Sequence, residues 1–212
     1  MLIQKFHPGL RPGQQLVGAG SGNPLFSRQG HWDGGCTLHC VAMALALLGR
    51  LDDPVDIRRR DTGPEAGFWD RAWPHYLHGL TLSELASFIW ELDLGVRPVA
   101  ARGGPATVLH FCERELARGR PVIIAWRSHA PQAHAALMIG VEGRQHKRAF
   151  TPHALLLLDP AEAEPGRAAC NARMEFEAER PSYATATTTY PVVIEGAVSI
   201  CAIAVPGAAG VD

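Results

Sequence analysis

The sequence predicts an α+β protein whose helical N-terminal half packs against a C-terminal antiparallel β-sheet. Between residues 36 and 119, apolar residues recur at helical spacing, whereas residues 121–205 contain short apolar runs bounded by polar or turn residues. Because the helices precede the strands, the two kinds of element are segregated, as in α+β architectures. With 212 residues, 47% of them hydrophobic, the chain can bury one core of ordinary size.

The first predicted helix covers residues 36–48 and is nearly all apolar. Its apolar positions follow the helical repeat: Leu38, Val41, Ala42, Leu45, Ala46 and Leu48. Gly49 comes next and can end the helix in the left-handed conformation that glycine adopts without steric cost. A helix that is apolar on most faces must lie inside the fold, covered by other elements.

Two further helices are predicted in the N-terminal half. Thr81 and Glu84 have the spacing of a capping box and indicate where the second helix begins. Residues 106–118, followed by Gly119, repeat apolar residues in the same way. Residues 52–79 separate the first two helices, and we interpret them as a loop because they are rich in Pro, Gly and charged residues.

The C-terminal half is predicted to form the sheet. Its expected strands cover residues 122–126, 135–141, 155–158, 185–194 and 198–205. The last two strands are separated by Glu195 and Gly196, which we expect to form the turn of a hairpin. This hairpin would complete the sheet.

Composition narrows the classes of function. Lys and Arg number 20 and Asp and Glu 21, so the chain has no excess of positive charge that would attract nucleic acid or an anionic membrane. We expect neither as a partner. The opening residues lack a signal-peptide pattern, and no apolar run is long enough to span a bilayer. We therefore expect a cytoplasmic protein, or one exported without a signal peptide by a dedicated secretion system. The five scattered cysteines are expected to be free thiols.

Cys36 stands at the start of the buried helix, directly after Asp33, Gly34 and Gly35. A helix N-terminus carries unpaired amide donors and a partial positive charge, which favour the thiolate and lower the pKa of a cysteine. The two glycines can leave the thiol open to a substrate. Cys36 is therefore a candidate nucleophile, although a cysteine here can equally be a small apolar residue that packs in the core.

His134 and Asp159 are candidate partners of Cys36. His134 begins an apolar strand, from which its imidazole can be aimed across a cleft at a helix N-terminus. Asp159 follows the next strand, and if the two strands pair antiparallel it can bind the imidazole N–H. Taken singly, each has an ordinary interpretation, as a surface histidine and as a turn residue. His129, in the preceding turn, is the weaker candidate for a base.

Several segments together resemble a known family. Residues 29–49 contain Gln29 upstream of Cys36 and the apolar helix beyond it, and residues 119–123 are followed by His134 and then by Asp159. In order and spacing these segments are similar to the bacteriocin-processing branch of the papain-like cysteine peptidases, which acts on double-glycine leaders. The resemblance implies a papain-like fold in which the first helix carries the active site.

The resemblance also implies a role for each residue. Cys36 would be the nucleophile, His134 the general base and acid, Asp159 the group that orients the imidazole, and Gln29 a side-chain donor to the oxyanion hole. The domain organisation expected is an irregular N-terminal arm (1–28), a papain-like catalytic domain (29–207, with a helical part 36–119 and a sheet part 121–205) and a tail (208–212). No cofactor is expected, and the partner would be a protein or peptide substrate.

Three functions are compatible with this pattern. The first is a cysteine peptidase that hydrolyses a peptide or isopeptide bond through a thioester at Cys36. The second is a papain-fold acyltransferase or deamidase, acting as an effector or toxin, because it forms the same acyl-enzyme and differs in the acceptor. The third is an inactive binding module, prompted by Gln29 standing seven residues before Cys36, one more than is usual in the family. A zinc site at Cys36, His39 and Cys40 is disfavoured because a fourth ligand is missing.

An aromatic group precedes the second predicted helix. It consists of Trp69, Trp73, Tyr76 and His78. These side chains could line a substrate groove beside the nucleophile, or they could cover the open end of the core, which is the interpretation we favour.

Overall fold

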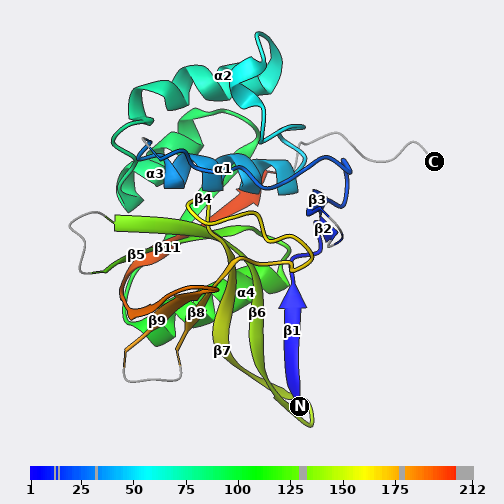
Figure 1. Cartoon of the computed structure of the whole chain (residues 1–212), viewed down its shortest axis with the longest axis vertical. Coiled ribbons are helices and arrows are strands. Elements are labelled where there is room, and N and C mark those ends of the chain that lie inside the picture. Colours follow the sequence, from blue (N-terminus) through cyan, green and yellow to red (C-terminus); the bar gives the residue numbers. More distant parts are fainter. Residues whose placement is uncertain (12, 14, 32, 129–132, 177–179, 204–212) are drawn as a thin grey trace.

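A computed structural model of the chain describes residues 1–11, 13, 15–31, 33–128, 133–176 and 180–203. Within these residues the protein is α+β, with four α-helices and a large sheet in which every strand pair is antiparallel (Figure 1). The helices are α1 (Cys36–Leu47), α2 (Gly63–Ala72), α3 (Leu82–Glu91) and α4 (Pro105–Ala117), with single 3-10 turns η1 (Ile57–Arg59) and η2 (Trp73–His75). The predicted fold class is confirmed at this level.

The large sheet has the strand order β10-β9-β8-β7-β6-β5-β11-β4, and β1 also pairs with β6. Its strands are β1 (Leu2–Phe6), β4 (Val96–Ala101), β5 (Val122–Arg127), β6 (Ala133–His146), β7 (Ala149–Leu158), β8 (Ala172–Glu175), β9 (Ser182–Thr185), β10 (Thr189–Pro191) and β11 (Val193–Ala202). The short strands β2 (Leu10–Arg11) and β3 (Val17–Gly18) form a separate pair.

The sheet separates two hydrophobic cores. On one face, α1, α2 and α3 pack together against residues of β5, β6 and β11, including Ile123, Leu137 and Val198. On the other face, α4 packs against alternate residues of the same strands, including Ile124 and Met138. Because successive strand residues point to opposite faces, strands that are buried on both sides read as continuous apolar runs.

The helix boundaries follow the local signals in the sequence. α1 starts at Cys36 and is buried along most of its length, as predicted. Gly49, just beyond it, has a φ of 64° and so takes the left-handed conformation expected of it. Thr81 and Glu84 form the predicted capping box: the Glu84 N–H donates to the Thr81 side chain, and the Glu84 carboxylate accepts from the Thr81 N–H at 2.8 Å.

The N-terminal arm and the helical half each contain a strand that was not predicted. Residues 2–6 are not irregular but form β1, which pairs with residues 140–144 of β6. β4 lies within the predicted helical part and pairs with β11 at the end of the chain. Both strands depend on partners about 100 residues or more away in the sequence, so local periodicity does not reveal them.

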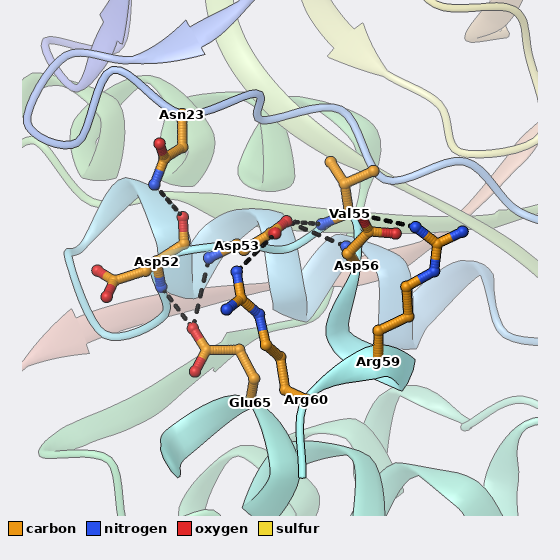
Figure 2. Close-up of polar contacts among 8 residues, drawn as sticks. All are labelled: Asn23, Asp52, Asp53, Val55, Asp56, Arg59, Arg60 and Glu65. Carbon is orange, nitrogen blue, oxygen red and sulfur yellow. Dashed lines mark hydrogen bonds and ion pairs between the residues drawn. The ribbon is translucent and has the colours of Figure 1, made fainter. Parts of the chain in front are cut away.

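Residues 52–79 are not a plain loop, because they contain α2 and the two 3-10 turns. Pro64 lies in the first turn of α2, where its missing N–H costs nothing, and Phe68 buries one face of the helix against the edge of the Phe88 ring. The residues before α2 are fixed by polar contacts (Figure 2). The Asp53 carboxylate accepts from the backbone N–H groups of Val55 and Asp56, both at 3.0 Å.

The same polar contacts join the arm to the helical half. Glu65 on α2 accepts from the Asp52 N–H at 2.7 Å, and the Asn23 amide donates to the Asp52 carbonyl at 2.9 Å (Figure 2). Arg60 donates to Asp53 at 3.1 Å. The segment that contains Asp52 is therefore hydrogen-bonded both to the N-terminal arm, through Asn23, and to α2, through Glu65.

The predicted hairpin at Glu195 and Gly196 is wrong. Both residues lie within β11, at a β-bulge where the pairing with β5 shifts between Ile194 and Gly196. Gly196 has a φ of 150°, and a Cβ there would lie 2.5 Å from the Ala101 carbonyl oxygen. Glycine is therefore required by the bulge and does not mark a turn. The hairpin is formed instead by β9 and β10, and residues 204–212, which include the predicted strand end and tail, lie outside the described residues.

Candidate active site

Cys36 is the first residue of α1 and lines a pocket. Gly35 is the residue before the helix, and no side chain caps this end. The first amide groups of a helix have no partner within it, so the N-terminus of α1 presents free donors beside the thiol. Cys36 is 7% exposed, and that exposed surface faces the pocket.

Three other cysteines, Cys40, Cys112 and Cys170, are in environments that do not favour a thiolate. All five are free thiols, as expected. Burial raises the pKa of Cys40 well above its usual value, and burial also raises the pKa of Cys112 to about 12. The pKa of Cys170 is raised by burial as well. Because the thiolate is the nucleophile, these positions are poor candidates for covalent chemistry.

His134 and Asp159 are brought together by the pairing of β6 with β7. Leu137 lies opposite Leu158, so the start of β6 meets the end of β7 as the antiparallel arrangement requires. The imidazole Nε2 lies 2.8 Å from each carboxylate oxygen of Asp159. This bond uses Nε2 and leaves Nδ1 for the hydrogen bond with Cys36, which is a second partner of the ring.

The charge on His134 is strongly favoured. Burial lowers the pKa of His134, but the hydrogen bonds with Asp159 and Cys36 and the negative charges of both raise it to about 10. An imidazole with this pKa is protonated at neutral pH and can stabilise a neighbouring thiolate. The three residues therefore lie in contact in the order Cys36, His134 and Asp159, with the imidazole between the thiol and the carboxylate.

Asp159 is itself held by several donors. Its side chain is buried and accepts from the Tyr183 hydroxyl at 2.5 Å and from the Ala161 N–H at 2.8 Å. The Asn171 side chain accepts from the Asp159 N–H at 2.7 Å and donates to the Asp159 carbonyl at 2.9 Å. Asp159 is thus fixed through both its side chain and its backbone, which limits how far the imidazole can turn.

Two aromatic side chains, Trp126 and Tyr183, pack beside His134 and Asp159. Trp126 on β5 is opposite His134 in the sheet, and the two rings meet edge to face with their centroids 5.0 Å apart. Trp126 also stacks on Tyr183, again at 5.0 Å. Burial and the Asp159 charge raise the pKa of Tyr183, so its hydroxyl keeps the proton that it donates to Asp159. Sequence reasoning missed Tyr183, Trp126 and Asn171, because nothing in their local pattern distinguishes them from core residues.

Gln29 lies beside the active-site loop. Its backbone N–H donates to the Pro160 carbonyl at 2.8 Å, which joins it to the residue after Asp159. Its side-chain amide donates to the Asp33 carbonyl at 2.6 Å, and Gln29 is not among the described residues that line the Cys36 pocket. An amide NH₂ has two hydrogens, so one remains for a further acceptor. The role of Gln29 as oxyanion donor stays a prediction.

The loop that leads into Cys36 is organised by Asp33. Its carboxylate accepts from the Gly30 N–H at 2.6 Å, the Gly35 N–H at 3.2 Å and the Tyr76 hydroxyl at 2.7 Å. Burial raises the pKa of Asp33, but hydrogen bonds with His39 and with the backbone lower it below its usual value overall. The ionised carboxylate therefore joins both ends of this loop to the segment that contains Tyr76.

Gly34 makes a close contact with the segment that contains Leu77 and Gly79. A Cβ on Gly34 would lie 2.6 Å from the Leu77 carbonyl oxygen, and a Cβ on Gly79 would lie 2.5 Å from the Gly34 carbonyl oxygen. Real Cβ atoms do not approach backbone atoms this closely. The two segments can therefore come this near to each other only because Gly34 and Gly79 have no side chain. This contact holds the loop before Cys36 against residues 77–79, along one wall of the pocket.

The pocket in front of Cys36 has a volume of about 540 Å³. One wall is formed by Gly34 and residues 77–82. The other contains Arg102, Arg127 and Glu195, together with Ala133, the residue before His134. It is therefore a cleft between the helical part and the ends of strands β5, β6 and β11, and Cys36 is one of its lining residues.

Most of the aromatic group lies away from this pocket. Trp69 and Tyr76 line a separate recess against α1, and their rings lie 5.6 Å apart. Trp73 stacks on Tyr76 and is 61% exposed. Only His78, of the four, lines the Cys36 pocket. Trp69 and Tyr76 thus lie beside α1, and Trp69 also packs against the core. His129, the weaker candidate base, lies outside the described residues.

A scan of the sequence against protein-family models finds no match, and neither does a comparison with curated proteins. Among the described residues, no group of three or more His, Cys, Asp or Glu side chains could hold a metal ion. None of the described helices has the length and apolar character needed to cross a membrane.

Proposed function

We propose that this protein is a cysteine peptidase with a papain-like fold, in which Cys36 is the nucleophile, His134 the general base and acid, and Asp159 the orienting group. The observation that carries the proposal is the chain of contacts from Cys36 through His134 to Asp159, which begins at a helix N-terminus and raises the pKa of His134 to about 10. The papain-like fold is supported by a buried helix that carries the cysteine and an antiparallel sheet that carries the other two residues.

Each residue has a defined part in the reaction. The Cys36 thiolate attacks the carbonyl carbon of the scissile bond, forming a C–S bond and an oxyanion. As the C–N bond breaks, His134 gives its proton to the leaving amine. A water molecule then loses a proton to His134 and attacks the thioester, which releases the acid and restores the thiolate–imidazolium pair.

The backbone N–H groups at the N-terminus of α1 would stabilise the oxyanion. The backbone N–H of Cys36 is one of the first amides of the helix, and donors of this kind are already oriented before the reaction begins. Gln29 would add a second donor through its side-chain amide. That contribution requires the amide to turn from Asp33 towards the pocket.

The test is to incubate the protein with a mixture of denatured proteins and identify new termini by mass spectrometry. Wild type should generate new N-termini, whereas Cys36→Ser and His134→Ala should not. Cys170→Ser is the matched control, because it removes a thiol away from the pocket and should leave cleavage unchanged. If Cys36→Ser cleaves as well as wild type, the proposal is wrong. Conversion of side-chain amides to acids, or new amide links, in place of cleavage would assign the deamidase or acyltransferase reaction instead.

A further inference from the structure

The pocket in front of Cys36 has one charged wall and one uncharged wall. The charged side chains are Arg102 at the end of β4, Arg127 at the end of β5 and Glu195 within β11. The opposite wall, residues 77–82, contains no carboxylate or guanidinium group. The charged groups of the pocket are therefore three side chains from the neighbouring strands β5 and β11 and from the residue that follows β4.

The β-bulge explains how Glu195 reaches the pocket. Glu195 is the extra residue between Ile194 and Gly196, where the pairing of β11 with β5 shifts. A bulge re-aims the side chain of its extra residue and commonly occurs beside active sites. Gly196 lets β11 pass close to β4, and a Cβ there would meet Arg102 Cγ at 3.3 Å. The aliphatic part of the Arg102 side chain therefore lies over Gly196, next to Glu195.

The charges on this wall do not cancel. Arg127 forms an ion pair with Glu195, which neutralises both. Arg102 donates to the Ser83 hydroxyl at 2.6 Å, and no carboxylate of the described residues pairs with it. Its guanidinium group has further N–H donors beyond the one that Ser83 accepts. Among the described residues, one positive charge with further N–H donors thus remains in the pocket that Cys36 lines.

We propose that this pocket binds an acidic side chain of the peptide substrate, and that Arg102 is the residue that determines this specificity. The inference rests on the proposed function for its substrate, and it adds the class of peptide that the site accepts. A guanidinium group binds a carboxylate through two parallel hydrogen bonds, so Arg102 favours Asp or Glu over neutral residues. A basic side chain is disfavoured because it would be placed against an uncompensated cation.

The first experiment uses two small reagents that alkylate Cys36, one anionic (iodoacetate) and one neutral (iodoacetamide). Mass spectrometry of the Cys36 peptide gives the ratio of the two labelling rates. Arg102→Glu should lower this ratio by about tenfold, because a change of about 1.4 kcal/mol in the attraction of the anion corresponds to that factor. Arg71→Glu should leave it unchanged. Arg71 is also exposed, and among the described residues it donates to the Gly67 carbonyl, but it lies on α2 and does not line the pocket.

The second experiment identifies the class of peptide. Short peptidyl chloromethyl ketones, with Glu, Gln or Lys placed in turn at each position, are compared by their rates of labelling Cys36. At one position or more, Glu should label faster than Gln and Gln faster than Lys. Arg102→Glu should reverse this order, whereas Arg71→Glu should preserve it.

The outcomes separate this proposal from the proposed function. If the iodoacetate ratio does not respond to Arg102→Glu, or if Glu probes label no faster than Gln probes, the specificity proposal is overturned even in an active peptidase. If the ratio falls as expected but the protein cleaves no peptide, the acidic-ligand site stands and the peptidase assignment fails. Measuring the ratio of the iodoacetate and iodoacetamide labelling rates requires only that Cys36 can be alkylated. The measurement therefore tests the specificity proposal even if the protein does not cleave peptides.

Discussion

The imidazole Nε2 of His134 lies 2.8 Å from both carboxylate oxygens of Asp159. These residues are 25 positions apart, and the sheet brings them together because the start of β6 pairs with the end of β7. The carboxylate is buried, so its charge is poorly screened by water and acts strongly on the ring. This contact is the main reason why His134 carries a positive charge.

Asp159→Asn tests the electrostatic part of that contact. Asn keeps the size of the side chain but removes the negative charge, so the pKa of His134 should fall from about 10 towards its ordinary value. An NMR titration of the His134 ring gives the pKa directly. The alternative outcome, a pKa that stays near 10 in Asp159→Asn, would mean that Asp159 does not stabilise the imidazolium.

The same pair should make stability depend on pH in the alkaline range. The folded-state pKa of His134 is raised above its unfolded value of 6.5, so the stabilisation from the pair is fully present below about pH 6.5 and is lost as pH rises through about 10. Urea unfolding of wild type and His134→Gln from pH 6 to pH 10, a range chosen around those two pKa values, should show the difference between them shrinking. A constant difference would rule out the raised pKa.

Tyr183→Phe removes the hydroxyl that donates to Asp159. We expect a loss of about 1–3 kcal/mol in the free energy of unfolding, because a buried carboxylate then lacks a donor. Labelling of Cys36 should slow as Asp159 and His134 become less fixed. Tyr190→Phe is the control, since Tyr190 packs on the Tyr183 ring but has no hydrogen bond to Asp159 among the described residues. Equal stability and labelling in both variants would show that Tyr183 only packs.

Gly34→Ala tests the contact between the loop before Cys36 and the segment that contains Leu77. The added Cβ would lie 2.6 Å from the Leu77 carbonyl oxygen, so one segment must move. We expect lower stability and slower labelling of Cys36 than in wild type. Gly20→Ala adds the same group where no atom lies within 4 Å, and it should have little effect on either measurement. Matching behaviour of the two variants would contradict the close contact.

Much of the helical part and the three candidate catalytic residues could be located from the sequence. α1 was predicted because its apolar repeat and Gly49 are local signals, and α3 because Thr81 and Glu84 form a capping box. Cys36, His134 and Asp159 each lie at the end of such an element. Residues at element ends can therefore be placed once the elements are known.

The remainder depends on contacts between distant segments. β1 and β4 owe their strand structure to β6 and β11, and Tyr183 on β9 reaches Asp159 at the end of β7 across the intervening strand β8. Glu195 and Gly196 were mistaken for a turn because a glycine within a bulge and a glycine in a turn look alike in sequence. Only the pairing of β11 with β4 and β5 distinguishes the two.

The most direct test of the central claim is the pH dependence of iodoacetamide labelling at Cys36, measured by mass spectrometry in wild type and in His134→Ala. A thiolate–imidazolium pair predicts that Cys36 of wild type reacts much faster than the other thiols at and below neutral pH, and that His134→Ala removes this advantage. If Cys36 reacts like an ordinary thiol in both proteins, with its rate rising only at alkaline pH, there is no such pair and the proposed enzyme mechanism is wrong.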